Sequence, residues 1–357
     1  MAYTTINKSS LNFNIKLYTG NGGTNAQTGV GFKPDFTWIK QRVSSGYNHA
    51  LFDVVRGATK VLQSNLTVAE RTLSDSLTAF GSDGFTLGAD GDGTYGNTVN
   101  QNTKSYCSWN WKAGGSNNGN TNGNITSTTS VNNTAGFSII TYTGSGSNAT
   151  VGHGLSTAPK MIIVKRKDVG ANWQVYNGNL AANQALELNG TGGNFTAANR
   201  WNSTAPTNTV FSVGNATEVN AQYGTYVAYC FADKTGYSKF GSYTGNGNAN
   251  GTFVYTGFKP AWTLIKRTDS GTGGSWILFD NKRATNVRNP IDVVMAASNN
   301  QSESDWGDAF DCDYVSNGFK WRFNGTNGYN NTSGATYIYM AFGQSLVGTN
   351  NVPCTAR

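Results

Sequence analysis

The sequence contains few charged residues, two histidines and four cysteines, and each scarcity argues against a class of protein. Charged residues make up 13% of the chain and aromatic residues 12%, so there is enough apolar surface to bury and disorder is not expected. Cys107, Cys230, Cys312 and Cys354 show neither CxxC nor CxH spacing, which argues against zinc and gives no sign of a disulfide scaffold. No hydrophobic run approaches the length of a membrane span, so we expect no membrane-spanning segment.

The charge that is present is scattered along the chain. Lys and Arg number 26 against 19 Asp and Glu, a net charge of +7 that favours anionic surfaces such as lipopolysaccharide or nucleic acid. Because no run of basic residues occurs, we interpret the cations as a solvated surface and expect no specific nucleic-acid binding.

Turn-forming residues are abundant, and they separate segments that recur three times. Glycine occurs 45 times, a composition typical of turn-rich all-β proteins because Gly and Asn supply positive-φ turns. Each copy begins with a related segment: LYTGNGGTNAQTGVGFKPDFTWIKQR from Leu17, TYTGSGSNATVGHGLSTAPKMIIVKRK from Thr141 and SYTGNGNANGTFVYTGFKPAWTLIKRT from Ser242. Related aromatic segments end them: SYCSWNWK from Ser105, TYVAYCFA from Thr225 and TYIYMAF from Thr336. A period of roughly 100 to 125 residues is too long for a solenoid unit and indicates a small domain per copy.

The copies divide the chain into three expected domains. We place the first repeat at residues 1–113 with an N-terminal lead-in strand, the second repeat at 135–236 and the third repeat at 237–357. Residues 114–134 are rich in Gly, Asn, Ser and Thr and have almost nothing to bury, which predicts a flexible or extended linker. The second junction is short, so we expect the second and third repeats to pack more rigidly than the first and second.

The closing segments alternate large apolar residues with smaller ones, as a strand does when one face packs on a core. The matched large positions are Cys107, Val227 and Ile338, then Trp109, Tyr229 and Met340, then Trp111, Phe231 and Phe342. SDGF from Ser82 and SNGF from Ser316 predict matching hairpin turns. We therefore predict an all-β fold of three tandem jelly-roll or concanavalin A-like antiparallel β-sandwich modules. Short helical turns are expected only in LTVAERTLSD from Leu66 and NPIDVVMAAS from Asn289.

Residues that usually carry acid–base catalysis do not recur in the repeats. His49 and His153 fall at different repeat positions, so no shared triad is available. Glycoside hydrolysis needs two carboxylates across the scissile bond, and no glutamate recurs among Glu70, Glu187, Glu218 and Glu303. We therefore predict that the protein is not an enzyme.

No cofactor is expected, with calcium as the alternative. GADGDGTYGN from Gly88 places Asp90 and Asp92 at a spacing that suits calcium, but the terminal glutamate of an EF-hand is missing, so we interpret this segment as a loop tip. ESDWGDAFDCDY, which contains Asp305, Asp308, Asp311 and Asp313, is interpreted as an exposed acidic loop rather than an acidic pocket.

Candidate binding residues are of two kinds. Basic pairs recur at the end of the same strand: Lys40 with Arg42, Lys165 with Arg166, and Lys266 with Arg267. Such an array suits the phosphate or carboxylate groups of a glycan, and a solvated strand end or an intrachain ion pair is the alternative. The tryptophans that lie beside polar turns and suit stacking on a sugar face are Trp201, Trp306 and Trp321. Trp173 and Trp276 share a repeat position, which favours the core.

The repeated sequence pattern YTGNG…GFKPDF…WIK…LFDVVRGATK…SDGF…SWNWKAGG closely resembles a module of virion structural proteins from marine bacteriophages. Its expected fold is similar to the concanavalin A-like lectin and glucanase sandwiches. The opening MAYTTINKSS and the ending NNVPCTAR also resemble that family, so the resemblance covers essentially the whole chain. It implies a phage particle component and transfers no catalytic residues. MAYTTINKSS has neither the cationic start nor the apolar core of a secretion signal, which agrees with a virion protein assembled in the host bacterial cytoplasm.

Three functions compete on these grounds. The first is a virion surface protein, such as a tail fibre or other appendage, that binds host cell-surface polysaccharide and other virion proteins. The second is a capsid decoration or head fibre with a purely structural role. The third is a glycan-degrading enzyme. Because fibre proteins are generally trimeric, we also expect a homo-oligomer.

Overall fold

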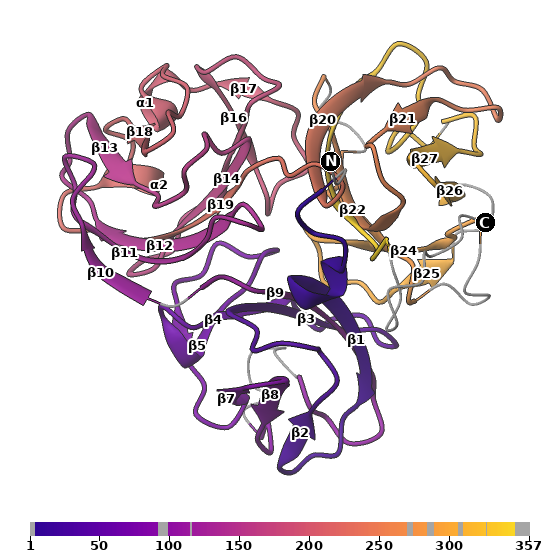
Figure 1. Ribbon diagram of the computed structural model, residues 1–357, viewed down its shortest axis with the longest axis horizontal. Helices are drawn as coiled ribbons and strands as arrows, with labels where there is room; N and C mark the ends of the chain where they lie inside the picture. Colours follow the sequence, from indigo (N-terminus) through magenta and orange to yellow (C-terminus); the bar gives the residue numbers. More distant parts are fainter. Residues whose placement is uncertain are drawn as a thin grey trace.

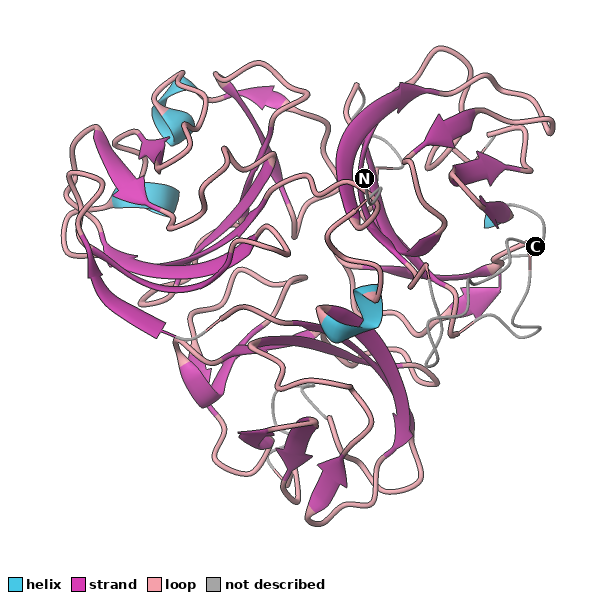
Figure 2. Cartoon of the chain, in the orientation of Figure 1, coloured by secondary structure: helices cyan, strands magenta, loops and turns pink. Residues whose placement is uncertain are grey.

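The computed structural model describes residues 4–91, 99–114, 116–269, 274–283, 289–305, 310–325 and 327–346. Antiparallel strands dominate these residues, as Figure 2 shows. The helices are the 3₁₀ helix η1 (Ser9–Leu11) and the single turns α1 (Ala198–Trp201) and α2 (Thr217–Asn220). None of these described helices has the length or the apolar character to cross a membrane. The all-β prediction is confirmed, whereas the jelly-roll and concanavalin A-like descriptions stay predictions.

Each repeat contributes one large sheet, and the order of its matched strands is the same in all three. In the first repeat the order is β1 (Phe13–Thr19), β9 (Ser105–Trp111), β3 (Phe36–Gln41), β4 (Ala50–Asp53), β5 (Gly57–Leu62) and β6 (Arg71–Thr72). In the second it is β12 (Phe137–Thr143), β19 (Thr225–Phe231), β14 (Met161–Arg166), β15 (Gln174–Asn177), β16 (Gln184–Glu187) and β17 (Phe195–Thr196). In the third it is β20 (Ser238–Thr244), β28 (Thr336–Gly343), β22 (Pro260–Arg267), β23 (Ile277–Asp280), β24 (Val293–Ala296) and β25 (Ser304–Asp305).

A smaller sheet lies on the outer side of each large one, as Figure 1 shows. The small sheets are β2 (Asn25–Gln27), β8 (Gly84–Leu87) and β7 (Leu77–Gly81); β13 (Ala149–Gly152) and β18 (Val210–Val213); and β21 (Phe253–Tyr255), β27 (Gly318–Trp321) and β26 (Cys312–Val315). Each pair of sheets encloses its own hydrophobic cluster. The predicted hairpin turns at Ser82 and Ser316 are confirmed, because they join β7 to β8 and β26 to β27.

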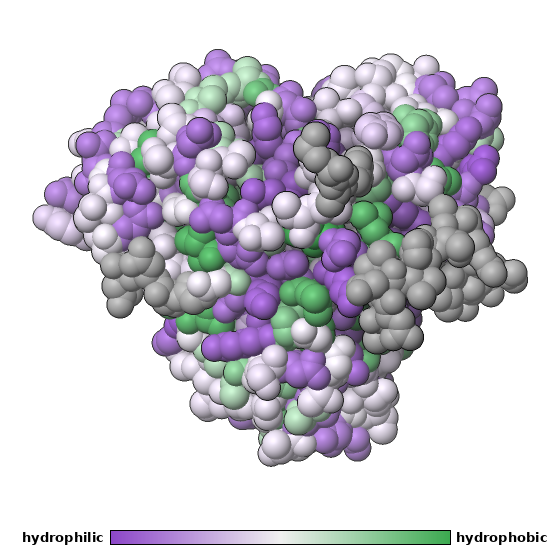
Figure 3. All heavy atoms as spheres, viewed as in Figure 1, coloured by the Kyte–Doolittle hydropathy of each residue, from purple (hydrophilic) through white to green (hydrophobic). Residues whose placement is uncertain are grey.

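A further hydrophobic cluster, here called the shared core, joins the inner faces of the three large sheets. Trp111, Phe231 and Phe342 lie at matched positions near the ends of the closing strands β9, β19 and β28 and meet near its centre. Their ring centroids lie 6.4 Å apart for Trp111 and Phe231, 5.7 Å for Trp111 and Phe342, and 6.1 Å for Phe231 and Phe342. The three repeats therefore form one body with an approximate threefold arrangement, and Figure 3 shows hydrophobic side chains at the surface where the lobes meet.

The expected linker at 114–134 is wrong. Its residues form β10 (Ser116–Asn120) and β11 (Ser127–Asn132), which extend the second large sheet beyond β12. Residues Ser127 to Asn132 pair in continuous register with β12. Composition misled us because strand pairing satisfies the backbone of an edge strand even where the side chains have little to bury.

The two expected helical turns are also wrong. Residues 66–70 contain no helix and lead into β6, while Val293–Ala296 is the strand β24. Pairing with a neighbouring strand outweighs a local helical preference of only a few tenths of a kcal/mol per residue.

The N-terminal segment fastens the first repeat to the end of the second and to the third. Thr4 Oγ1 donates to the carbonyl of Thr235 at 2.6 Å, and the backbone N–H of Leu346 donates to the carbonyl of Asn7 at 2.9 Å. Ile6 is buried in the shared core. This lead-in therefore closes the circle between the two ends of the chain.

Candidate functional site

The contact between the shared-core faces of two repeats is here called a seam, and the three seams share one plan. A backbone N–H of one repeat donates across each seam: Glu70 to Lys167, Asn194 to Thr268, and Glu303 to Arg42, at 2.9, 2.8 and 2.9 Å. An aromatic ring nitrogen also bonds a carbonyl across each seam: Trp173 to Gln63, Trp276 to Glu187, and His49 to Ala296, at 2.8, 2.8 and 3.0 Å. Glu70 and Glu303 therefore do occupy matching positions, which the sequence comparison missed.

The recurring lysines do not form a surface array. Lys40, Lys165 and Lys266 are all buried at the outer end of a seam, opposite Cys107, Val227 and Ile338 on the neighbouring closing strands. Lys165 Nζ donates to the carbonyl of Thr67 in the first repeat at 2.8 Å, and Lys266 Nζ donates to the carbonyl of Thr191 in the second at 3.0 Å. The expectation failed because the strand face that carries these lysines is the shared-core face.

Burial lowers the pKa of each seam lysine. The pKa falls to about 8 in Lys40, where burial is joined by the nearby positive charge of Arg283, and to about 8 in Lys165. In Lys266 burial lowers the pKa to about 7. Lys165 and Lys266 donate across their seams, whereas Lys40 donates to the carbonyl of Gln41 in its own strand at 3.0 Å, and the burial of all three keeps them from a ligand at the surface.

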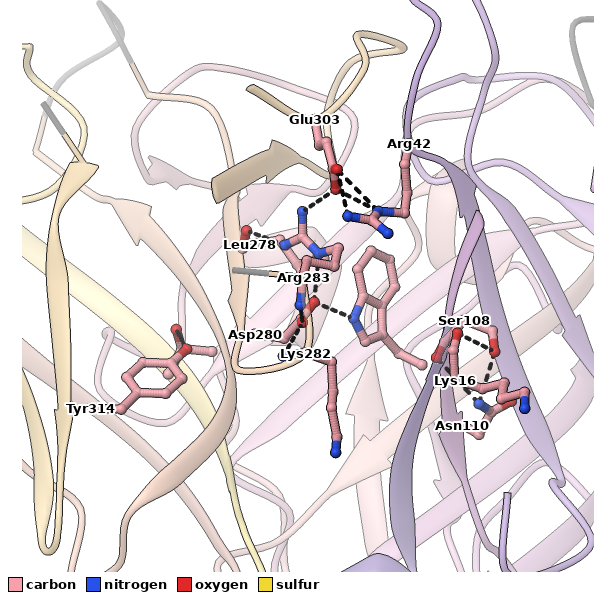
Figure 4. A network of polar contacts seen from close by, with 12 residues as sticks. Lys16, Arg42, Ser108, Asn110, Leu278, Asp280, Lys282, Arg283, Glu303 and Tyr314 are labelled. Atoms are coloured by element: carbon pink, nitrogen blue, oxygen red, sulfur yellow. Dashed lines mark hydrogen bonds and ion pairs between the residues drawn. The ribbon is translucent and has the colours of Figure 1, made fainter. Parts of the chain in front are cut away.

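A buried ionic network holds the seam between the third and first repeats (Figure 4). Arg283 Nε lies 2.6 Å from Asp280 Oδ2, and both side chains are fully buried. Trp109 Nε1, from the first repeat, donates to the same Asp280 oxygen at 2.9 Å. Glu303 binds Arg42 of the first repeat at 2.7 Å and lies 3.5 Å from Arg283. Although burial opposes its charge, Asp280 raises the pKa of Arg283, so the cation is permanent.

The residues at the positions matched to this network are charged in one of the other two seams and uncharged in the other. Between the first and second repeats, Arg56 pairs with Asp53 and Glu70, and Tyr229 of the second repeat donates to Asp53 at 2.8 Å. Between the second and third repeats the matched residues are uncharged: Asn177, Leu180, Asn194 and Met340. Each Asp-x-x-Arg pair thus lies beside an aromatic side chain of the next repeat that donates a hydrogen bond, Tyr229 or Trp109. The uncharged pair, Asn177 and Leu180, is matched instead with Met340.

Both histidines have structural partners. Trp38 Nε1 can only donate, so its 2.9 Å bond to His49 Nδ1 fixes the neutral tautomer that donates from Nε2 to Ala296. Burial lowers the pKa of His49 well below its usual range, and burial also lowers that of His153. His153 Nδ1 accepts from the N–H of Leu155, and its Nε2 contacts the carbonyl of Thr207.

The calcium candidates do not form a metal site in the described residues. Asp90 is buried, and its carboxylate accepts from Ser76 Oγ and from the backbone N–H groups of Val99 and Asn100 at 2.6 to 3.1 Å. Burial raises its pKa to about 6. Asp92 lies outside the described residues, and no cluster of three ligating side chains occurs within them. Of the acidic loop, Asp308 also lies outside, and Asp313 pairs with Arg322.

The tryptophans selected for sugar stacking are not available. Trp201 and Trp321 are buried in the cores of the second and third repeats, because their strands and turns face inward. Trp306 lies outside the described residues. Trp173 and Trp276 are buried, as their shared position indicated.

The remaining basic candidates and the cysteines also have assigned places. Arg166 binds Asp168 at 2.9 Å and Arg267 binds Asp269 at 2.8 Å, which confirms the intrachain ion pair as their arrangement. Cys107, Cys230 and Cys312 are free and buried, and Cys354 lies outside the described residues.

Exposed aromatic side chains gather on the outer sheet of the third repeat. Phe253 is 45% exposed and Tyr255 is 61% exposed, with the buried Val254 between them on the edge strand β21. Residues two apart on a strand share a face and lie about 7 Å apart. Lys320 lies opposite Phe253 in the β21–β27 pairing, so its side chain is on the same face, where its Nζ donates to Asn250 Oδ1 at 2.6 Å. We call Phe253, Tyr255 and Lys320 the aromatic face.

Sequence reasoning missed this face because it weighed tryptophans and passed over TFVYTG. The signal was present as two aromatic residues that flank one apolar residue in a short strand. The matched strands β2 and β13 contain no aromatic residue, so this face belongs to the third repeat alone. Its exposed rings with neighbouring polar groups suit the apolar face and hydroxyls of a sugar.

The chain was compared with protein-family models and with curated proteins. A family model described as a domain of unknown function (DUF7483) matches residues 8–345. No curated protein matches the chain. The matched range includes all three repeats and all three seams.

Proposed function

The chain belongs to the DUF7483 family of domains, and from that premise we propose that it is a non-enzymatic surface protein of a bacteriophage particle that binds host glycans. The aromatic face carries the proposal, because it places two exposed rings beside the cation of Lys320 on one face of a sheet. The resemblance of the repeated sequence pattern to virion structural modules supports the proposed location on a bacteriophage particle.

The arrangement of the carboxylates favours binding over hydrolysis. Glu70 and Glu303 are bound to Arg56 and Arg42 in the seams. Glu218 binds Arg200 at 2.8 Å. Glycosidases need two carboxylates that flank a bound sugar, and these are committed to holding repeats or turns together.

Binding to host polysaccharide tests the proposal directly. The full chain is applied to a glycan array and to polysaccharide-coated biosensors, together with Phe253→Ala/Tyr255→Ala. We expect the variant to lose binding by at least about tenfold, because each stacked ring contributes on the order of 1 kcal/mol. Tyr223→Ala is the matched control, since Tyr223 is 79% exposed on a turn of the second repeat.

Stability measurements separate binding from folding. The side chains of Phe253 and Tyr255 are exposed, so their removal should leave the unfolding free energy within about 0.5 kcal/mol of that of the unaltered chain. Trp201→Ala and Trp321→Ala are unsuitable as binding tests because both rings are buried. If the array shows no binding by the unaltered chain, the capsid decoration with a purely structural role replaces this proposal.

The position on the particle is a separate question with its own measurement. Electron cryo-microscopy of virions with an antibody fragment against the third repeat distinguishes tail from head. Labelling confined to the head would contradict the adsorption role and favour decoration. Release of reducing sugar from host polysaccharide would instead favour an enzyme.

A further inference from the structure

A cavity of about 230 Å³ lies at the seam between the first and third repeats, beside the N-terminal lead-in. Strand β1 contributes Phe13 and Ile15 to its wall, and β22 contributes Ala261. The turn after β23 contributes Asn281 and Lys282. We call this cavity the seam pocket. At roughly 30 Å³ per water it has room for about seven waters, which suits a molecule the size of one sugar ring.

The turn after β23 explains why this seam has a pocket. In the first repeat the matched turn carries Val54 and Val55, which pack against the shared core. In the second repeat the matched Asn179 donates to the carbonyl of Phe240 across the seam at 3.4 Å. The third repeat has Asn281 and Lys282 instead, so a polar turn faces an apolar wall.

Two polar side chains of the turn after β23 line the seam pocket. The Oδ1 atom of Asn281 is buried and accepts no hydrogen bond from the described residues. Lys282 is exposed, and its side chain extends away from the Asp280–Arg283 pair in Figure 4. By contrast, Ser10 and Ser345 in the same pocket bond each other at 3.0 Å. A ligand hydroxyl would supply the donor that Asn281 Oδ1 lacks, and an anionic group on the same ligand would pair with the exposed ammonium group of Lys282.

We propose that the seam pocket binds one carboxylate-bearing sugar residue, with Lys282 on the carboxylate, Asn281 Oδ1 on a hydroxyl and Phe13 against the ring. The choice of a sugar rests on the glycan-binding function proposed above. The pocket itself lies on the shared-core side of the third repeat and is separate from the aromatic face.

The test uses the full chain and two probes, methyl β-D-glucuronide and the uncharged methyl β-D-glucoside. Saturation-transfer NMR and calorimetry should detect the glucuronide, and the glucoside should bind about tenfold to a hundredfold more weakly because it lacks the charge-assisted bond. Asn281→Val/Lys282→Val, which installs the turn of the first repeat, should abolish binding. Lys33→Ala removes an equal charge from an exposed turn and should leave binding unchanged.

Other outcomes overturn the proposal. Glucuronide that binds the Asn281→Val/Lys282→Val variant as well as the unaltered chain, or equal binding of both probes, would exclude this site. Thermal unfolding of the variant confirms that it is folded. Phe253→Ala/Tyr255→Ala separates the two sites: if it abolishes polysaccharide binding and glucuronide still binds, both stand. If the chain binds polysaccharide but not glucuronide, only the proposed seam-pocket site is contradicted. If it binds glucuronide but not polysaccharide, the seam-pocket site is supported and the proposed glycan-binding function is contradicted.

Discussion

Removal of Arg283 is the sharpest test of how the seams hold the repeats together. The Arg283→Leu change installs the residue that the second repeat has at Leu180. Asp280 would keep bonds from Trp109 Nε1 and from two backbone N–H groups, at 2.9 to 3.0 Å, but would lose the Arg283 guanidinium. Leaving a buried carboxylate without its cation costs about 3–5 kcal/mol of unfolding free energy.

The double variant Asp280→Asn/Arg283→Leu supplies the internal comparison. It reproduces the Asn177 and Leu180 pair of the uncharged seam, so the buried charge disappears with its partner. We expect its cost to stay below about 2 kcal/mol, because replacement of a whole buried ion pair is often close to neutral. Urea unfolding followed by tryptophan fluorescence measures all the variants, provided that the slope with urea is unchanged.

The matched control is Arg166→Leu, which breaks a partly exposed pair with Asp168. Its cost should be within about 1 kcal/mol. Should Arg283→Leu cost no more than this control, the ionic network would not stabilise the seam. Asp280→Asn alone completes the cycle. If its cost and that of Arg283→Leu simply add in the double variant, Asp280 and Arg283 would not be coupled, and the reasoning would be refuted.

Three further predictions concern the seams. The unfolded chain protonates His49 at a higher pH than the folded chain does. The free energy of unfolding should therefore decrease as the pH is lowered below about 6.5, by up to about 1.4 kcal/mol per pH unit. Trp38→Leu/His49→Trp, which copies the third repeat, should reduce this slope in urea titrations. Lys266 loses its proton at a pKa of about 7 when folded and near 10.4 when unfolded, so stability should rise with pH between these values, and Lys266→Met should flatten that rise. An excised third repeat, 237–346, would expose its shared-core face and should form trimers or aggregates in size-exclusion chromatography; a stable folded monomer would contradict the shared core.

The candidate site was only partly predictable. Two-residue periodicity identified the closing strands and their large apolar residues correctly, because that period is a local property of a strand with one buried face. The same alternation placed Lys40 and its counterparts on one face, but it carried no information about what packs against that face. Trp201 and Trp321 were misjudged for a related reason: polar neighbours in the sequence do not report whether a ring points outward.

The all-β class, the triplication, the hairpins and the burial of the closing strands could be predicted from the amino-acid sequence, because each depends on residue type and spacing within a short segment. The shared core, the pairing of 114–134 into a sheet and the position of the recurring lysines inside the seams came only from the three-dimensional arrangement. These features depend on which face of one repeat meets another, and surfaces more than a hundred residues apart are brought together by packing that no local pattern encodes. The same packing leaves Phe253 and Tyr255 exposed on the outer sheet of the third repeat and forms the seam pocket between the first and third repeats.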